Sequence, residues 1–470
     1  MEVFYDRGRA HELESLEEQY EREGFSFVVI YGRRRVGKTS TISEFIRRGD
    51  KRAIRFTATE NTNSVNMEGF SKSVFSMFPR PSSQGGFPSW EGAMDYIVER
   101  AGGERLVLSI DEYPYLAKAY PPLSSELQRH IDLVLKDTNI MLILCGSSMS
   151  FMERQVLGYQ SPLYGRRTAQ LRVDPLDYLD SAEFFGDACA EDKLLGYAVT
   201  GGVPQHLSTI AEAGTVEKGI AASFFRKKGL LYEEPYNLLK QELRQPATYN
   251  AIIGTVANGA TRMNEIASKT GMEGGAAAVY VKNLVDLGIL EKEAPMFAKD
   301  NRNGVYRIKD GMYRFWYRFV PGAVTLIDAG DERVYEDLVR PSINDFMGPA
   351  FEDICKQYLM RLNLKREMPF IFNRIGRWWG GNPVTKRETE IDIVASSPEG
   401  GRIVMGECKW RNREAGRDVY ESMRDNAVLF PDKDVHYYIF SKSGFTPGLE
   451  EEAERNERLT LVGINDLFRA

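Results

Sequence analysis

Strand-sized segments alternate with amphipathic segments over the first 175 residues. The strand-sized segments are short, apolar or alternating, and bounded by glycine or polar residues; they lie at 25–32, 52–58, 105–112 and 139–148. Segments with apolar residues at helical spacing, such as 39–48, separate them. Strands that alternate with helices are typical of a parallel sheet covered by helices on both faces. We therefore expect an α/β domain over residues 1–175.

The pattern changes three times beyond residue 175. Residues 176–240 are mostly helical in pattern, and we expect them to form a lid. Three short helical segments followed by a hairpin-like segment predict a winged helix-turn-helix over 241–320. Residues 340–470 predict a small α/β domain that begins with a long helix. The strands expected there lie near 369–373, 388–395, 402–409 and 435–441, with a helix around 417–429.

Charge and composition narrow the possible functions. The net charge is −6 at pH 7, so nucleic-acid binding would require a local basic surface. No apolar run approaches the roughly 20 residues that span a bilayer, and the charged N-terminus has no signal-peptide core. We therefore expect a cytoplasmic protein without a membrane partner. Four widely spaced cysteines and four scattered histidines argue against a zinc site or a disulfide framework.

Residues 32–39 carry the strongest chemical motif. They read G-R-R-R-V-G-K-T between a predicted strand and a predicted helix. Backbone amides of such a loop close around phosphate oxygens, Lys38 reaches the β- and γ-phosphates, and the Thr39 hydroxyl holds Mg²⁺. We predict an ATP site with Mg²⁺. The predicted nucleotide-binding residues are Gly32, Arg33, Arg34, Arg35, Val36, Gly37, Lys38, Thr39 and Ser40.

Polar residues follow the next two strands of the predicted sheet. Asp111 is predicted to bind the Mg²⁺ shell and Glu112 to act as general base for the attacking water. Ser147, at the end of the following strand, either contacts the γ-phosphate or the water, or caps the strand. Arg166 and Arg167 lie in a downstream loop. They either act as arginine fingers toward the nucleotide of a neighbouring subunit in a homo-oligomer, or form a solvated basic loop.

A second constellation lies near the C-terminus. Glu407 and Lys409 are two residues apart on a predicted strand, so their side chains face the same side, and Asp392 can join them from a neighbouring strand. Asp392 and Glu407 are predicted to hold Mg²⁺ or Mn²⁺, while Lys409 orients water and stabilises charge on the phosphorane. Glu352, on the preceding helix, can add a fourth group. The alternative is a surface strand with an Asp–Lys salt bridge.

The N-terminal segments together resemble the archaeal-type ATPases, AAA-like P-loop proteins allied to the STAND signalling ATPases. The resemblance rests on VVIYGRRRVGKTSTISEF, LVLSIDEYPYL, LILCGSSMSFM, SPLYGRRTAQLRVDPL and TGGVPQHL. It implies a nucleotide-binding domain, a helical lid, a winged helix and often a nuclease-like domain. It also implies that Pro204, in a G-x-P turn, approaches the base or ribose of ATP. The N-terminal box F-x-x-R-E-x-E-L departs from the family pattern, because Phe4-Tyr5-Asp6-Arg7 is followed by GRAHEL.

The set Asp392, Glu407 and Lys409 resembles the PD-(D/E)xK core of restriction-type nucleases, including the preceding helix with Glu352. The resulting hypothesis is an ATPase whose C-terminal domain is a metal-dependent DNA nuclease, gated or assembled by ATP. The alternative is a nucleotide-switched signalling or DNA-binding protein with a non-catalytic nuclease-like domain. A third reading is a toxin or defence effector.

The predicted winged helix has a mild excess of positive charge. Residues 247–320 contain ten Lys or Arg and seven Asp or Glu. Its candidate recognition helix is poor in Arg and Asn, which indicates weak base readout. Lys299, Arg302 and Arg307 of the wing are predicted to bind DNA phosphates, unless the winged helix is a protein-packing module.

Overall fold

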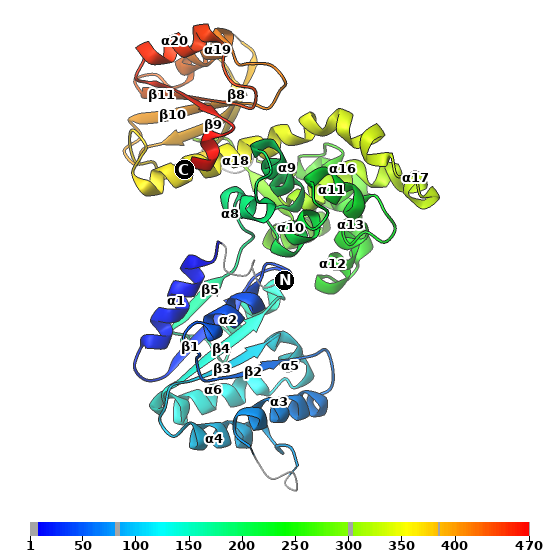
Figure 1. Cartoon of the computed structure of the whole chain (residues 1–470), viewed down its shortest axis with the longest axis vertical. Coiled ribbons are helices and arrows are strands. Elements are labelled where there is room, and N and C mark those ends of the chain that lie inside the picture. The colour runs from blue at the N-terminus through cyan, green and yellow to red at the C-terminus, as the bar shows by residue number, and fades with distance from the viewer. Residues whose placement is uncertain (1–7, 80–84, 299–303, 384–385, 470) are drawn as a thin grey trace. The chain divides into compact units, whose positions relative to one another are not determined.

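The chain folds into two compact units. The computed structural model describes residues 8–79, 85–298, 304–383 and 386–469. Unit 1 comprises residues 1–175 and 203–205, and unit 2 comprises 176–202 and 206–470 (Figure 1). Within the described ranges, none of the helices combines the length and apolar character needed to cross a membrane.

A five-stranded parallel sheet forms the centre of unit 1, with the strand order β2-β3-β4-β1-β5. Every position of β1, β3 and β4 is buried, because these central strands are covered on both faces. The predicted parallel α/β sheet is therefore confirmed. The strands are β1 (Ser26–Tyr31), β2 (Ala53–Thr57), β3 (Leu106–Asp111), β4 (Ile140–Gly146) and β5 (Ala169–Arg172).

Helices α1 and α2 share one core with the sheet of unit 1. Leu13 and Leu16 of α1 and Phe45 of α2 pack with Val28 and Ile30 of β1. This packing fixes the loop between β1 and α2 relative to the sheet. The helices of unit 1 are α1 (Ala10–Glu21), α2 (Lys38–Arg47), α3 (Asn63–Met77), α4 (Trp90–Ala101), α5 (Tyr113–Ala119), α6 (Leu123–Leu133) and the short α7 (Met149–Phe151).

Unit 2 begins with helices and continues into a helix–hairpin arrangement of the winged type. Helices α13, α14 and α15 precede an antiparallel hairpin formed by β6 (Leu290–Glu293) and β7 (Val305–Ile308). The expected domain borders at 240, 320 and 340 all lie inside this unit, and they stay predictions. The helices are α8 (Tyr178–Ala182), α9 (Ala190–Thr200), α10 (Pro204–Ala211), α11 (Val216–Phe224), α12 (Glu234–Glu242), α13 (Pro246–Ala257), α14 (Met263–Thr270), α15 (Gly274–Asp286), α16 (Gly311–Phe319), α17 (Val324–Ala329) and α18 (Ile343–Lys365).

A second five-stranded sheet ends the chain, with the order β12-β11-β10-β9-β8. β8, β9 and β10 pair antiparallel, whereas β10, β11 and β12 pair parallel. Helix α18 contacts β9 and β10, and α19 and α20 contribute apolar side chains to the core of this sheet. The elements are β8 (Arg374–Gly381), β9 (Glu388–Ser396), β10 (Arg402–Lys409), α19 (Arg417–Asn426), β11 (Asp434–Ser441), α20 (Pro447–Arg455) and β12 (Leu459–Gly463).

The strand expected near 369–373 is wrong. That segment is not a strand, because the side chain of Asn363 satisfies its backbone: Asn363 Nδ2 donates to the Phe372 carbonyl and Asn363 Oδ1 accepts from the Phe372 amide, both at 3.0 Å. The real first strand, β8, is rich in glycine and tryptophan and lacks the usual alternating signature. Trp378 of β8 packs against the core beside Phe430, with ring centroids 6.1 Å apart.

Candidate functional site

The loop between β1 and α2 surrounds the ammonium group of Lys38. This side chain is buried, and its Nζ donates to the carbonyls of Gly32 at 2.9 Å and Arg33 at 2.8 Å. A phosphate oxygen is a stronger acceptor for an ammonium than a neutral carbonyl is. Lys38 is therefore held on the loop by contacts that a nucleotide phosphate can replace.

Two glycines make the close geometry of this loop possible. A Cβ at Gly32 would lie 2.2 Å from the carbonyl oxygen of Val173, so no larger residue fits there. Gly37 precedes α2 with φ of 94°, a left-handed conformation that favours glycine. A Cβ at Gly37 would meet Pro204 Cγ at 3.9 Å, so Pro204 lies beside the loop. The G-x-P turn is thus next to the predicted nucleotide site.

The predicted Mg²⁺ residues meet at the end of β3. Thr39 Oγ1 donates to Asp111 Oδ2 at 2.6 Å, and Asp111 Oδ1 accepts from the amide of Glu112 at 2.9 Å. Asp111 is buried. A hydroxyl and a carboxylate are oxygen ligands of the type that Mg²⁺ takes beside phosphate groups. The chemistry of this donor pair therefore fits the predicted ion.

Glu112 is held by Ser147. Its carboxylate Oε2 accepts from Ser147 Oγ at 2.8 Å and from the Ser147 amide at 3.3 Å. Glu112 also has φ of 52° and ψ of 40°, a left-handed conformation that costs a non-glycine residue on the order of 1 kcal/mol. The strained backbone and the hydrogen bonds together aim the carboxylate at the end of β4. The structure thus brings these two predicted site residues together.

The remaining predicted loop residues differ in their surroundings. The guanidinium of Arg34 donates to the Tyr115 hydroxyl at 2.7 Å, and Arg35 has a left-handed backbone with φ of 67°. Val36 is fully buried, and Ser40 lies partly exposed in the first turn of α2.

Arg9 is a site-supporting residue that the sequence reasoning missed. It is 5% exposed and donates from Nη2 to the carbonyls of Val36 at 2.7 Å and Asp174 at 2.8 Å, and from Nη1 to Glu12 at 2.9 Å. It therefore ties the phosphate-binding loop to the segment after β5. The signal was the segment RAHEL, in which Arg9, Glu12 and Leu13 keep the spacing R-x-x-E-L of the family box. Phe4-Tyr5-Asp6-Arg7 lies outside the described residues.

The two candidate arginine fingers differ in their contacts. Arg166 forms a bidentate pair with Asp132, at 2.8 Å from Nε and 2.7 Å from Nη2. This hydrogen bonding raises the pKa of Arg166 and lowers that of Asp132. The guanidinium of Arg167 lies over the ring of Tyr164, 5.8 Å from its centroid. Arg166 is therefore engaged by a carboxylate of its own chain, while Arg167 is not part of that pair.

The C-terminal constellation draws together residues from α18, β9 and β10. Asp392 Oδ2 accepts from the amide of Cys408 at 2.8 Å, and Lys409 forms an ion pair with Glu407. Burial and the charge of Asp392 raise the pKa of Glu407. The same two causes raise the pKa of Glu352 to about 7. The charge of Asp392 thus acts on both glutamates.

Each glutamate of this region faces a cation. Glu407 is paired with Lys409, and Glu352 Oε2 lies 3.4 Å from Arg377 Nε. Across the described part of the chain, no three His, Cys, Asp or Glu side chains are gathered closely enough to form a metal-binding group. The donor set of Asp392 and Glu407 is of the oxygen type that Mg²⁺ and Mn²⁺ take.

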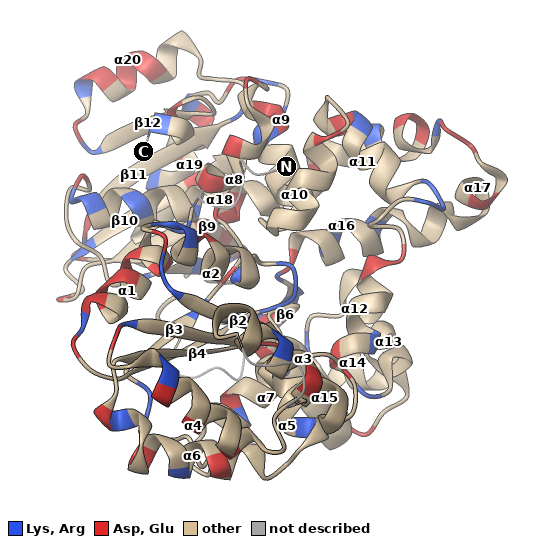
Figure 2. Ribbon diagram, turned by 60° about the horizontal axis from the view of Figure 1, so that its bottom comes forward, with Lys and Arg blue, Asp and Glu red and all other residues tan. Residues whose placement is uncertain are grey.

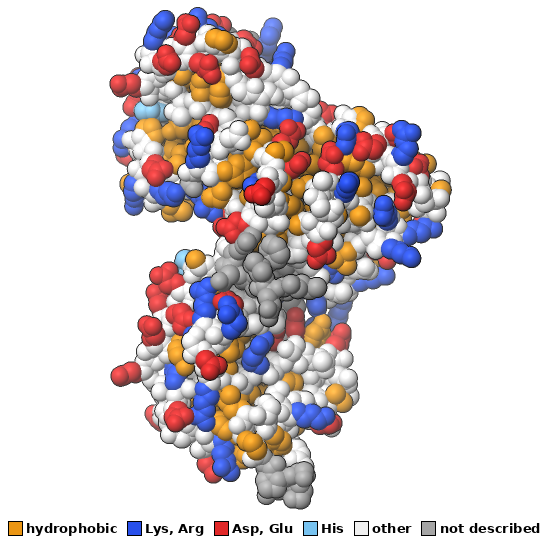
Figure 3. Space-filling model, viewed as in Figure 1, with side chains coloured by type: hydrophobic (Ala, Val, Ile, Leu, Met, Phe, Trp, Pro, Cys, Tyr) orange, Lys and Arg blue, Asp and Glu red, His pale blue; other side chains and the backbone are white. Residues whose placement is uncertain are grey.

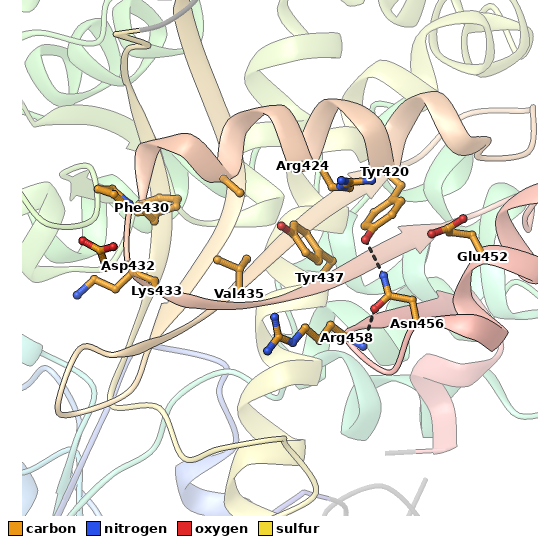
Figure 4. A pocket seen from close by; sticks show the side chains of 12 residues that line it. Tyr420, Arg424, Phe430, Asp432, Lys433, Val435, Tyr437, Glu452, Asn456 and Arg458 are labelled. Carbon is orange, nitrogen blue, oxygen red and sulfur yellow. Dashed lines mark hydrogen bonds between the residues drawn. The ribbon is translucent and has the colours of Figure 1, made fainter.

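A cavity beside this sheet is not lined by Asp392 or Glu407. It has a volume of about 540 Å³ and lies where β11 and β12 begin (Figure 4). Tyr420 and Tyr437 form one wall, and the Tyr420 hydroxyl accepts from Asn456 at 2.6 Å.

In the described part of the wing, the predicted phosphate-binding residue Arg307 contacts acidic side chains. Arg307 Nη2 lies 2.8 Å from Asp353 and its Nε 2.5 Å from Glu291. Its guanidinium is thus paired with acids of its own chain, and the phosphate contact predicted for Arg307 stays a prediction. The other two wing cations, Lys299 and Arg302, lie outside the described residues. The ribbon of α15 is almost entirely uncharged (Figure 2). On the face shown in Figure 3, acidic and basic side chains are interspersed over both units.

Comparisons with known proteins agree with the geometry of unit 1. Residues 4–210 match a family model described as an ATPase domain predominantly from Archaea. Residues 316–419 match a second family, described as archaeal and bacterial proteins of unknown function. This second match includes Glu352, Asp392, Glu407 and Lys409.

Three known proteins extend this picture. The chain is 31% identical over 450 residues to the uncharacterized protein MJECL04 of Methanocaldococcus jannaschii. The aligned region covers 94% of this chain and 96% of the relative. The Walker-type ATPase PABY2304 of Pyrococcus abyssi is 20% identical with a TM-score of 0.50, covering 66% of this chain and 95% of that chain. The ORC2 protein of Aeropyrum pernix is 12% identical with a TM-score of 0.45, covering 68% and 94%.

The likeness to the Pyrococcus abyssi structure supports the fold, and the match to MJECL04 runs through both units. The ATPase match coincides with the parallel sheet, with Lys38 in its loop and with Asp111 at the end of β3. The chain therefore belongs to the same family as MJECL04 of Methanocaldococcus jannaschii, and its N-terminal unit is a P-loop ATPase domain of the archaeal type.

Proposed function

We propose that this protein is an ATPase whose nucleotide state controls a metal-dependent DNA nuclease in unit 2. The observation that carries the nuclease part is the convergence of Asp392, Glu407, Lys409 and Glu352 from two adjacent strands and one helix. The matched family of unknown function spans the same four residues. Residues 176–240 serve as the lid of the nucleotide site, and 241–320 as the winged helix.

In the nucleotide site, ATP binding replaces several hydrogen bonds that the side chains make within the protein. Lys38 leaves the carbonyls of Gly32 and Arg33 for phosphate oxygens. Thr39 and Asp111 would hold Mg²⁺, and the ion would neutralise charge on the phosphates. Glu112 leaves Ser147 and accepts a proton from the attacking water. The ground-state hydrogen bond from Ser147 thus restrains the base before nucleotide is in place.

The nuclease site uses a similar exchange. Asp392 and Glu407 would hold Mg²⁺ or Mn²⁺, and the ion would supply Lewis acidity at the scissile phosphate. Lys409 leaves Glu407 and turns toward the scissile phosphate, where its charge stabilises the phosphorane. Glu352 completes the acidic wall of the site from α18.

The test is a DNA cleavage assay on the full chain. Plasmid and single-stranded DNA are incubated with Mg²⁺ or Mn²⁺, with and without ATP, using the wild type, Lys409→Ala and the exposed control Lys433→Ala. We expect metal-dependent cutting that Lys409→Ala loses and Lys433→Ala keeps, with a rate that depends on ATP. Cutting that survives equally in Lys409→Ala would remove the assignment of this site.

A second candidate function is a nucleotide-switched binding protein. The ion pairs of Glu407 with Lys409 and of Glu352 with Arg377 favour it, because cations of the chain itself already balance the charge of both carboxylates. In that case no DNA is cut under any condition, and ATP changes the affinity for DNA or for a protein partner. A gel-shift measurement with ATP and ADP distinguishes the two functions.

A further inference from the structure

The segment after β6 is part of the C-terminal domain's structure. The amide of Met296 donates to the carbonyl of Arg377 in β8 at 2.8 Å, and the Met296 side chain is buried in the core of the C-terminal sheet. The next residue, Phe297, packs on Phe430 with ring centroids 5.8 Å apart. The wing and the proposed nuclease domain are therefore packed together.

Arg377 lies at the point where these parts meet. The pairing of β8 with β9 is irregular between Gly376 and Trp378, which marks a β-bulge at Arg377. A bulge re-aims a side chain relative to a regular strand. The guanidinium contacts carboxylates from three elements, namely Glu293 of β6 at 3.4 Å, Glu352 of α18 at 3.4 Å and Glu390 of β9.

The wing anchors this arginine through a shared network. Glu293 also lies 3.5 Å from Arg307 and 3.7 Å from Lys356. Asp353, the neighbour of Glu352 on α18, accepts from Arg307 at 2.8 Å and lies 3.5 Å from Arg314 of α16. Charged residues of the wing therefore pair with α18 at Asp353 and Lys356, which follow Glu352 in the chain.

We infer that Arg377 is a positioning residue for Glu352, and that Glu293 of the wing sets the orientation of Arg377. This inference rests on the proposed nuclease function. A largely buried carboxylate that loses its cation partner is left with an uncompensated charge, which is strongly unfavourable in that position. Groups that orient the residues of a metal site typically change affinity or activity 10- to 100-fold when they are removed. A displacement of the winged helix that moves Glu293 is thereby transmitted to the nuclease site.

The experiment compares four variants of the full chain: Arg377→Met, Arg377→Lys, Glu293→Gln and the double variant Arg377→Met/Glu293→Gln. Arg318→Met is the matched control, because Arg318 is an exposed arginine 3.9 Å from Asp345 and outside this network. The readouts are kcat and KM for DNA cleavage and the affinity for Mn²⁺ alone by calorimetry. Circular dichroism verifies that each variant is folded.

We expect Arg377→Met to lower kcat by 10- to 100-fold and to weaken Mn²⁺ binding, with KM for DNA nearly unchanged. Arg377→Lys recovers part of the loss, because it keeps the charge but not the planar fork. Glu293→Gln gives a smaller loss of kcat. The double variant has the same kcat as Arg377→Met, because Glu293 acts only through Arg377.

The outcomes separate this inference from the proposed function. If the wild type binds Mn²⁺ or cuts DNA and Arg377→Met matches Arg318→Met in both readouts, the inference is overturned while the function stands. Additive losses in the double variant overturn the link to the wing. A wild type that neither binds Mn²⁺ nor cuts DNA overturns the proposed function, and the inference with it.

Discussion

Single residues in this protein are held by interactions that nucleotide binding can replace. Lys38 is bound to two carbonyls of its own loop, and Glu112 is bound to Ser147. Each is the charged group that the P-loop chemistry requires at its position. Replacement of these contacts by phosphate and water connects ligand binding with the start of catalysis.

The role of Glu112 gives the first prediction. Glu112→Gln keeps the shape of the side chain but removes the base, so we expect unchanged ATP affinity and a 100- to 1000-fold lower turnover. Phosphate release and fluorescent-nucleotide binding measure the two quantities, with the exposed Glu99→Gln as control. Turnover at the wild-type rate would mean that another group is the base.

The buried Arg9 gives the second prediction. Arg9→Ala leaves the carbonyls of Val36 and Asp174 without their donor, which costs about 3 kcal/mol of unfolding free energy. The loop also loses its anchor, so ATP binding weakens by about tenfold or more. Urea unfolding and nucleotide titration test this, with Arg22→Ala at the exposed end of α1 as control. Equal effects of the two substitutions would contradict the anchoring role.

At the scale of elements, α18 connects the winged helix with the C-terminal sheet. It presents Glu352 to Asp392 and Arg377, and Asp353 to Arg307. The pKa values of these two adjacent acids are therefore shifted in opposite directions. Glu352 has a raised pKa because of burial and a nearby carboxylate. For Asp353, burial raises the pKa, but the cations around it outweigh that effect and lower it.

The pKa of Glu352 gives a pH-dependent prediction for the metal-free protein. Because the pKa is about 7 in the folded chain and near 4.5 when unfolded, the folded state holds an extra proton between these values. The stabilising effect of the protonated carboxyl is fully present below pH 4.5 and is lost as pH rises through 7, by roughly 3 kcal/mol. We therefore expect Glu352→Gln to unfold like the wild type at pH 5 and to be more stable at pH 8.

Tryptophan fluorescence during urea unfolding in EDTA measures this difference. Four of the five tryptophans, Trp316, Trp378, Trp379 and Trp410, belong to unit 2. Glu421→Gln, an exposed change on α19, is the control. Stability curves for wild type and Glu352→Gln that stay parallel from pH 5 to 8 would contradict the raised pKa.

At the scale of the whole molecule, the chain combines an ATPase unit with a unit that contains the proposed nuclease. Assembly through an arginine finger would make the ATPase depend on a second copy of the chain. The pairing of Arg166 with Asp132 makes Arg167 the better candidate for that role.

The oligomer prediction follows from that difference. If Arg167 is the finger, ATP turnover per subunit rises with protein concentration, and Arg167→Ala abolishes this rise with a 100-fold or greater loss. Arg166→Ala removes a structural ion pair and keeps the concentration dependence. Steady-state assays over a wide concentration range, together with sedimentation, test it. A flat rate per subunit would argue for hydrolysis within a single chain.

The sequence by itself determined the ATPase sheet and its phosphate-binding loop. Both are local: a buried strand, a glycine turn and a helix lie within about twenty residues, so the motif at 32–39 already contains its geometry. That Glu407 and Lys409 face the same side was likewise readable, because strand periodicity places residues i and i+2 on one side; their ion pair was not predicted.

Only the tertiary structure decided how charges are paired. The partners of Arg377 and Arg307 lie as far as 84 and 46 positions away in the chain, and no local pattern relates them. Arg9 and Asp174 are likewise far apart in the chain. The contact of Asn363 with the backbone of Phe372, in the segment where a strand was expected, was also not readable from a local pattern. Hydrophobic periodicity predicts which side of an element is buried. The partner of a charged side chain depends instead on distance and burial, and both are determined by how the elements pack.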